Sequence, residues 1–122
     1  MAWDLKNDRP IYTQLVEQIA IGIVSGNYPI GEKLPSVRDL ASQAAVNPNT
    51  MQRALTELER KGLVHTQRTN GRYITEDNRM IEKVRQELAQ EQISEFIQSM
   101  TKLGFKKTET VQLINKFMEE EK

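Results

Sequence analysis

The chain has 122 residues, of which 38% are hydrophobic, and it carries 17 basic and 17 acidic side chains. This length fits one small domain with an appendage, because domains commonly contain about 100–150 residues. The absence of cysteine excludes disulfides, thiolate catalysis and cysteine-ligated metals. No apolar run approaches the roughly 20 residues that a membrane-spanning helix needs, and the first residues lack the pattern of a signal peptide. We therefore expect a cytoplasmic protein that binds no membrane.

The balanced net charge conceals one basic segment. Between residues 33 and 72 the chain has seven Lys and Arg residues but only three Asp and Glu residues. Ionic screening limits the reach of a charge to about 10 Å at ordinary salt, so a phosphate backbone responds to this local excess and not to the total. The overall charge is therefore compatible with a nucleic-acid partner.

The first two predicted helices lie at residues 10–25 and from residue 36 onward. The first has apolar residues at every fourth position, with Pro10 suited to its first position and Gly26 to its C-cap. Ser36 and Asp39 form a capping box at the start of the second. A third helix begins about three residues after the second ends, so the pair predicts a helix-turn-helix with its turn at residues 45–46.

The third predicted helix covers residues 47–61 and opens with Asn47-Pro48. Asn47 is a strong N-cap, and Pro48 follows where a helix has no use for a backbone N–H. One face of this helix is apolar and the other is polar. The apolar face holds Met51, Ala54, Leu55 and Leu58, and the polar face holds Asn49, Arg53, Thr56 and Arg60, with Gln52 and Glu57 on its flanks.

Two short strand-like segments, residues 63–67 and 72–75, follow the third helix. The turn between them contains Asn70-Gly71, which is typical of a β-hairpin. Arg68 and Arg72 flank this turn, so its tip is basic. A helix-turn-helix followed at once by a hairpin predicts a winged helix, whose hairpin is the wing.

The remaining chain predicts a long helix at residues 78–103 and a shorter one at residues 109–120 capped by Thr108. At 1.5 Å per residue the long helix would extend about 40 Å, too far to pack wholly on its own small domain. Both helices have apolar faces that would bury most area against a second copy of the chain. The residues predicted to form this dimer contact are Ile81, Val84, Leu88, Ile93, Phe96, Ile97, Met100, Leu103, Ile114 and Phe117.

Catalysis has no support in the sequence. His65 is the only histidine, no glycine-rich phosphate loop is present, and no pair of carboxylates has an apolar setting. We expect no catalytic residue, no cofactor and no metal. DNA binding is favoured instead, because Asn and Gln can pair with adenine and Arg with guanine from a helix in the major groove. Asn49, Gln52 and Arg53 are placed for that role, and Asn47 either caps the helix or joins them.

Two motifs stand out in this region: G-x-x-L-P-S-x-R-x-L-A at residues 31–41 and V-N-P-N-T-x-x-x-A-L-x-x-L-x-x-x-G-L at residues 46–63. Both resemble the winged-helix domain of the GntR family of bacterial transcription regulators. The resemblance covers about residues 8–75. It departs at Pro48, where many members have a basic residue, and in the wing, which lacks the frequent R-G-x-G pattern. The resemblance implies DNA contacts by Ser36, Arg38, Asn47, Asn49, Thr50, Gln52, Arg53, Gly71 and Arg72. Arg68 joins these predicted DNA-binding residues because it lies at the basic tip of the wing.

The short C-terminal part resembles the YtrA-like subfamily, in which two helices replace a large effector domain and serve dimerisation. This implies a winged helix-turn-helix domain at residues 1–76 and a two-helix dimerisation region at residues 77–122. The expected function is a homodimeric DNA-binding regulator, in the role of a repressor, on a palindromic operator of double-stranded DNA. Two alternatives stay open: a winged helix that binds protein and no DNA, and a metabolite-responsive regulator with an effector site between the C-terminal helices.

Overall fold

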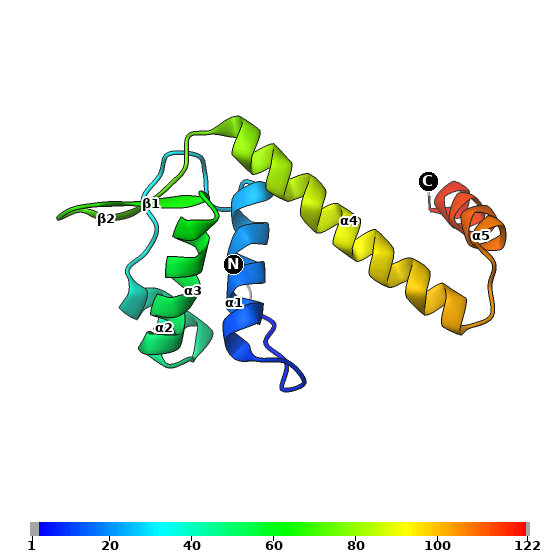
Figure 1. Ribbon diagram of the computed structural model, residues 1–122, viewed down its shortest axis with the longest axis horizontal. Helices are drawn as coiled ribbons and strands as arrows, with labels where there is room; N and C mark the ends of the chain where they lie inside the picture. The colour runs from blue at the N-terminus through cyan, green and yellow to red at the C-terminus, as the bar shows by residue number, and fades with distance from the viewer. Residues whose placement is uncertain (1–2, 122) are drawn as a thin grey trace. The chain divides into compact units, whose positions relative to one another are not determined.

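The computed structural model describes residues 3–121 and has the mainly helical fold, with one small hairpin, that the sequence predicts (Figure 1). The chain divides into two compact units, one ending at Arg85 and the other beginning at Gln86. This division falls inside the fourth helix, later in the chain than the boundary predicted at residue 76. The elements are α1 (Ile11–Val24), α2 (Val37–Ala44), α3 (Pro48–Arg60), β1 (Val64–Gln67), β2 (Gly71–Ile74), α4 (Asn78–Lys102) and α5 (Lys107–Glu120).

The core of the first unit lies where α3 packs against both α1 and α2 (Figure 1). The four-residue spacing predicted for α1 is confirmed, since Leu15, Ile19 and Ile23 are buried along one face. β1 contacts α3, and the hairpin contributes to the same core. The largest fully buried apolar side chains are Leu15, Ile19, Ile23, Leu40, Met51, Leu55, Leu58, Leu63 and Ile74.

Both helices of the helix-turn-helix begin at the predicted caps. The Ser36 hydroxyl accepts a hydrogen bond from the Asp39 N–H at 3.1 Å, and Asn47 Oδ1 accepts one from the Asn49 N–H at 2.7 Å. The turn between the helices has no glycine, and Ala45 adopts the left-handed conformation with φ 56°. A residue with a Cβ occupies that region at a cost of about 1–2 kcal/mol, which the packing of α2 on α3 offsets.

The hairpin is an antiparallel pair with His65 opposite Tyr73 and Thr66 opposite Arg72. Its outer edge is also paired, because the Leu34 N–H donates to the Arg72 carbonyl at 2.9 Å and the Ile74 N–H donates to the Glu32 carbonyl at 2.9 Å. The wing is therefore held at its base by the segment before α2 as well as by α3. A lone two-stranded hairpin is marginal in water, so this additional pairing stabilises it.

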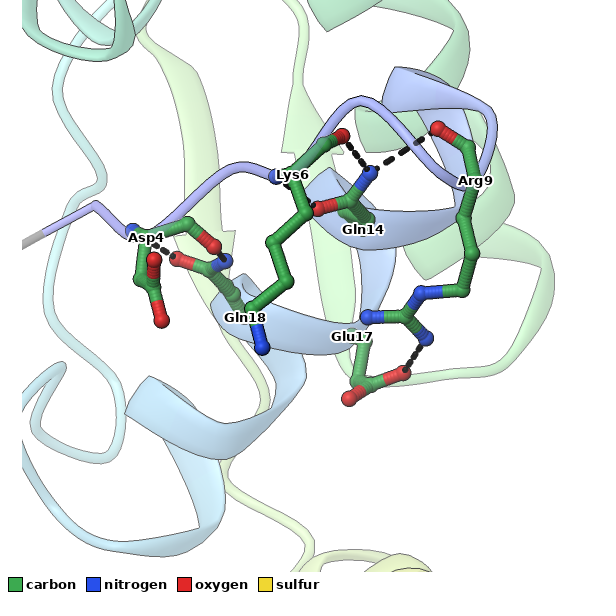
Figure 2. Close-up of polar contacts among 6 residues, drawn as sticks. All are labelled: Asp4, Lys6, Arg9, Gln14, Glu17 and Gln18. Atoms are coloured by element: carbon green, nitrogen blue, oxygen red, sulfur yellow. Dashed lines mark hydrogen bonds and ion pairs between the residues drawn. The ribbon is translucent and has the colours of Figure 1, made fainter.

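An N-terminal arm, residues 4–9, lies along α1 and is fastened by two glutamines (Figure 2). Gln14, only 1% exposed, accepts from the Lys6 N–H at 2.6 Å and donates to the carbonyls of Lys6 at 2.7 Å and Arg9 at 2.9 Å. One turn later, Gln18 exchanges two hydrogen bonds with the Asp4 backbone. Sequence patterns did not predict this arm, because they treat glutamine as a polar residue that faces solvent.

The second unit consists of the rest of α4, a turn and α5. Gly104, with φ 95°, follows the end of α4, as its type predicts. The prediction that Thr108 caps α5 is wrong, because the helix already begins at Lys107. The Glu109 carboxylate accepts the N–H of the N-cap residue Lys106 at 2.9 Å, so a first-turn acid bonds back to the helix start.

Candidate nucleic-acid interface

The polar face of α3 is exposed, and its apolar face is buried against α1 and α2. Asn49, Gln52 and Arg53 are exposed and Thr50 is half-buried, while Met51 and Ala54 on the other side are fully buried. Asn47 caps the helix and Pro48 occupies its first position, and the next N–H groups, of Asn49 and Thr50, bond to the Asn47 side chain and carbonyl. The predicted base-reading residues therefore share one accessible surface with a helix N-terminus, which favours anions.

Arg53 is held against α1 by an aromatic ring. Its guanidinium carbon lies 4.5 Å from the centre of the Tyr12 ring. Such a cation–π contact contributes about 0.5–1 kcal/mol at an exposed site and restricts the side chain to few rotamers. Tyr12 was not among the predicted site residues, because its contact with Arg53 joins two helices that are far apart in the sequence.

A cleft of about 720 Å³ lies between the start of α2 and the wing. Ser36 and Asp39 line it from α2, and Gly71 lines it from β2. Gly71 has φ 100°, which strains any residue with a Cβ, and a Cβ there would lie 3.2 Å from Cε of Lys33, so that side chain would have to shift. The full lining is Lys33, Leu34, Pro35, Ser36, Val37, Asp39, Thr69, Asn70, Gly71 and Arg72.

The arginines predicted to contact DNA differ in whether a carboxylate already pairs with them. Arg38 on α2 and Arg68 in the wing turn are exposed and have no ion pair among residues 3–121. Arg72 is different, because its Nε donates to Oε1 of Glu59 at 2.5 Å and its side chain is only 17% exposed. The structure thus separates two free arginines from one that is already paired.

The C-terminal end of α3 carries a second arginine–carboxylate pair, between Arg60 and Glu57. Arg60 donates from Nε to Glu57 at 2.9 Å and also from a terminal nitrogen. The hydrogen bond from Arg60 is the main reason that the pKa of Glu57 falls below its ordinary value. Within the described part of the basic segment, the cations without a carboxylate partner are Lys33, Arg38, Arg53, Lys61 and Arg68.

The residues predicted to form a dimer contact are not equally available. Ile81 is buried within the first unit, so its side chain has little surface left for a partner. Half-buried members of the set are Val84, Leu88, Ile97 and Met100. The exposed members are Ile93, Phe96, Leu103, Ile114 and Phe117, and the structure adds Val111, Leu113 and Met118, which are also exposed.

Within the second unit an apolar groove of about 560 Å³ runs between α4 and α5. Phe96 and Met100 line it from α4, and Leu113, Ile114 and Phe117 line it from α5. Two charged side chains, Lys116 and Glu120, stand at its edge. A groove with such a lining is suited to apolar side chains of another helix.

Residues 11–74 match the sequence profile of the gntR family of bacterial regulatory proteins. The chain belongs to the GntR family. The matched range runs from the start of α1 to the end of β2, so it contains the helix-turn-helix and the wing. This GntR protein is accordingly a transcriptional regulator with a DNA-binding domain, and its family and relatives are regulators and not enzymes. No helix between residues 3 and 121 is both long and apolar enough to cross a membrane.

Relatives of known sequence support this assignment along nearly the whole chain. The uncharacterized HTH-type transcriptional regulator YhcF of Bacillus subtilis is 39% identical over 114 residues, which are 93% of this chain and 94% of YhcF. The HTH-type transcriptional repressor YtrA of the same organism is 43% identical over 74 residues, which are 61% of this chain and 57% of YtrA.

Solved structures show the same fold. A GntR family regulator from Listeria monocytogenes superposes with a TM-score of 0.84 at 42% identity, covering 92% of this chain and 98% of that one. The DNA-binding domain of AraR, in complex with operator ORE1, superposes with a TM-score of 0.53 at 25% identity. That match covers 62% of this chain and 94% of the AraR domain.

The structure of this GntR regulator adds Tyr12, Glu59 and Lys33 to the residues around its candidate interface. Tyr12 and Glu59 lie in other elements than Arg53 and Arg72, which they contact, and Lys33 lines the cleft from the segment before α2, so no local spacing in the sequence could indicate these positions. The excess of basic residues between 33 and 72 was the one available signal, and it included Lys33 but could not tell which arginines are paired.

Proposed function

We propose that this GntR regulator binds an operator of double-stranded DNA as a homodimer and acts as a repressor in the cytoplasm. The observation that carries the proposal is the exposed polar face of α3, with Asn49, Gln52 and Arg53 beside a capped helix start. These side chains have the donors and acceptors that read base edges in the major groove. AraR, whose DNA-binding domain shares this fold, is bound to an operator in its solved structure, which supports the same use here.

Phosphate contacts surround this face in the proposed complex. Arg38 and Ser36 at the start of α2 and Arg68 in the wing turn are all exposed, and they flank α3 along the chain. Contacts of this kind position a protein on the duplex without reading sequence. We therefore assign Arg38 and Arg68 to the backbone and Gln52 to base recognition.

The exposed apolar side chains of the second unit support the proposed homodimer. Eight large apolar residues between 86 and 121 are at least 40% exposed, whereas Ile30 is the only one in the described part of the first unit. Such a patch on a small monomer is costly in water, and a second copy would cover it with the same residues. A two-fold dimer would present two α3 helices, so the proposed operator is palindromic.

Selection of DNA from a random pool by the full-length protein would provide the operator, after which affinity is measured at several salt concentrations. Arg38→Ala should weaken binding to every sequence and lower the salt slope by about 0.9, because one phosphate contact is lost. Gln52→Ala should lower discrimination at one base position by about 1–3 kcal/mol. Arg79→Ala, at the exposed start of α4, is the control for loss of charge alone.

A flat salt dependence on both selected and random duplex would refute DNA binding and favour a winged helix that binds protein. The dimer is tested separately by sedimentation. Phe117→Asp should shift the protein toward monomer, whereas Ile30→Asp, which places the same charge on an exposed apolar site of the first unit, should not. A monomeric wild-type protein at tens of micromolar would contradict the homodimer.

A further inference from the structure

Glu59 connects α3 to both strands of the wing through a single carboxylate oxygen. Its Oε1 accepts the Thr66 hydroxyl at 2.9 Å and the Arg72 Nε at 2.5 Å. Thr66 and Arg72 are directly opposite each other in the hairpin. The carboxylate therefore bonds to one matched cross-strand pair, and both bonds oppose rotation of the wing relative to α3.

Arg72 is committed to this arrangement through its backbone as well as its side chain. Its carbonyl accepts the Leu34 N–H at 2.9 Å, and its side chain is 17% exposed against 30% for Glu59. Burial acts to raise the pKa of Glu59, but the hydrogen bonds from Arg72 and Thr66 and the charge of Arg72 lower it on balance. The ion pair is thus formed across the neutral pH range.

The pair adds no net charge to the DNA-facing surface. A free Arg72 would attract phosphate, but a carboxylate 2.5 Å from its Nε cancels that field beyond a few ångströms. Arg68, by contrast, is exposed at the wing turn and has no ion pair within the described chain. The wing consequently has one cation for attraction and another that is fixed to α3.

We propose that Glu59 and Arg72 are positioning residues, which set the wing relative to α3 so that Arg68 meets DNA when α3 enters the groove. The inference rests on the proposed DNA binding and revises the expectation that Arg72 itself contacts DNA. Its physical basis is preorganisation. A hairpin that is ordered before binding loses less conformational entropy on the DNA, so the contact of Arg68 contributes more fully to affinity.

A double-mutant cycle between Arg72 and Arg68 tests this directly on the selected operator. Arg68→Ala should weaken binding roughly tenfold, as expected for a charged contact to phosphate. Arg72→Met keeps the aliphatic stem and should cause a similar loss alone, but little further loss in the Arg68→Ala background. Additive losses, with a further fall of about 0.9 in the salt slope, would show a direct phosphate contact and overturn the proposal.

Two carboxylates of α3 provide a matched pair of charge removals. Glu59→Gln and Glu57→Gln each remove one negative charge from the same helix, but Glu57 bonds to Arg60 and not to the wing. Glu59→Gln should weaken operator binding, whereas Glu57→Gln should leave it unchanged or strengthen it. Equal strengthening by both substitutions would mean that only charge matters, and the positioning role would be wrong.

Amide hydrogen exchange in the DNA-free protein gives a readout that does not depend on DNA binding. Exchange across residues 64–74 should accelerate in Glu59→Gln and Arg72→Met and stay at the wild-type rate in Glu57→Gln. Arg72→Lys, which retains the charge but not the Nε geometry, should be intermediate and guards against a variant that fails to fold. Unchanged exchange in all variants would refute the anchoring, while accelerated exchange in a protein that binds no DNA would refute the proposed function alone.

Discussion

Truncation of Gln14 tests how the N-terminal arm is held on α1. The Gln14 side chain is 1% exposed and makes three hydrogen bonds of 2.6, 2.7 and 2.9 Å to the backbone of Lys6 and Arg9. A buried hydrogen bond contributes about 0.5–1.5 kcal/mol net, and truncation also removes buried methylene contacts. Gln14→Ala should therefore lower the free energy of unfolding by about 2–4 kcal/mol.

Gln18 supplies the matched control one turn further along the same helix. It also bonds to the arm, exchanging two hydrogen bonds with the Asp4 backbone, but these lie at the exposed surface where water can replace them. Gln18→Ala should cost less than about 1 kcal/mol. Both variants remove the same amide group, so the difference between them reflects the burial of Gln14 together with its one additional hydrogen bond.

The assay combines urea denaturation with the fluorescence of Trp3, which is the only tryptophan of the chain. Its indole nitrogen is buried, so release of the arm should move the emission to longer wavelength before the domain unfolds. We expect this red shift in native buffer for Gln14→Ala and wild-type emission for Gln18→Ala, both at one protein concentration. Equal stability losses in the two variants, or an unshifted spectrum for Gln14→Ala, would refute the reasoning.

Three further substitutions probe the remaining local features. Asn47→Ala removes the 2.7 Å capping hydrogen bond to the Asn49 N–H and should lower the free energy of unfolding by about 1 kcal/mol in thermal denaturation. An unchanged melting temperature would mean that this cap does not stabilise the helix. Ala45→Gly relieves a φ of 56° and should raise stability by about 0.5–1 kcal/mol; a loss would contradict the left-handed turn. The pKa of Glu59 is depressed in the folded state, so its contribution to stability is present above the ordinary glutamate value of about 4.3 and is lost as the pH falls through the folded value. Glu59→Gln should flatten the acid limb of stability against pH, and an unchanged limb would exclude that role.

Local chemistry accounts for what the sequence could predict. The starts of α2 and α3 were identified at Ser36 and Asn47, because each cap bonds to an N–H only two or three residues ahead. The division of α3 into an apolar and a polar face was predicted from the 3.6-residue period of a helix. The hairpin turn was predicted from Asn70-Gly71. The cap predicted for α5 was wrong, because the helix begins at Lys107, and Glu109 bonds back to the Lys106 N–H.

Interactions between distant residues account for what the sequence could not predict. Gln14 looks like a solvent-facing residue until the arm folds over it from eight residues away. Arg72 looks like a free cation until the hairpin brings it to Glu59, thirteen residues earlier. Ile81 looks like part of a dimer face, yet it is buried within the first unit.

The sequence by itself determined the family, the order of the elements and the residues that α3 presents, because all of these depend on bonds and periods within a few residues. The tertiary structure alone decided which of those polar groups are free. A charge or an amide is available to a partner only when no distant part of the chain has bonded to it. Those bonds depend on how α1, α3 and the wing pack together, which no spacing along the chain encodes.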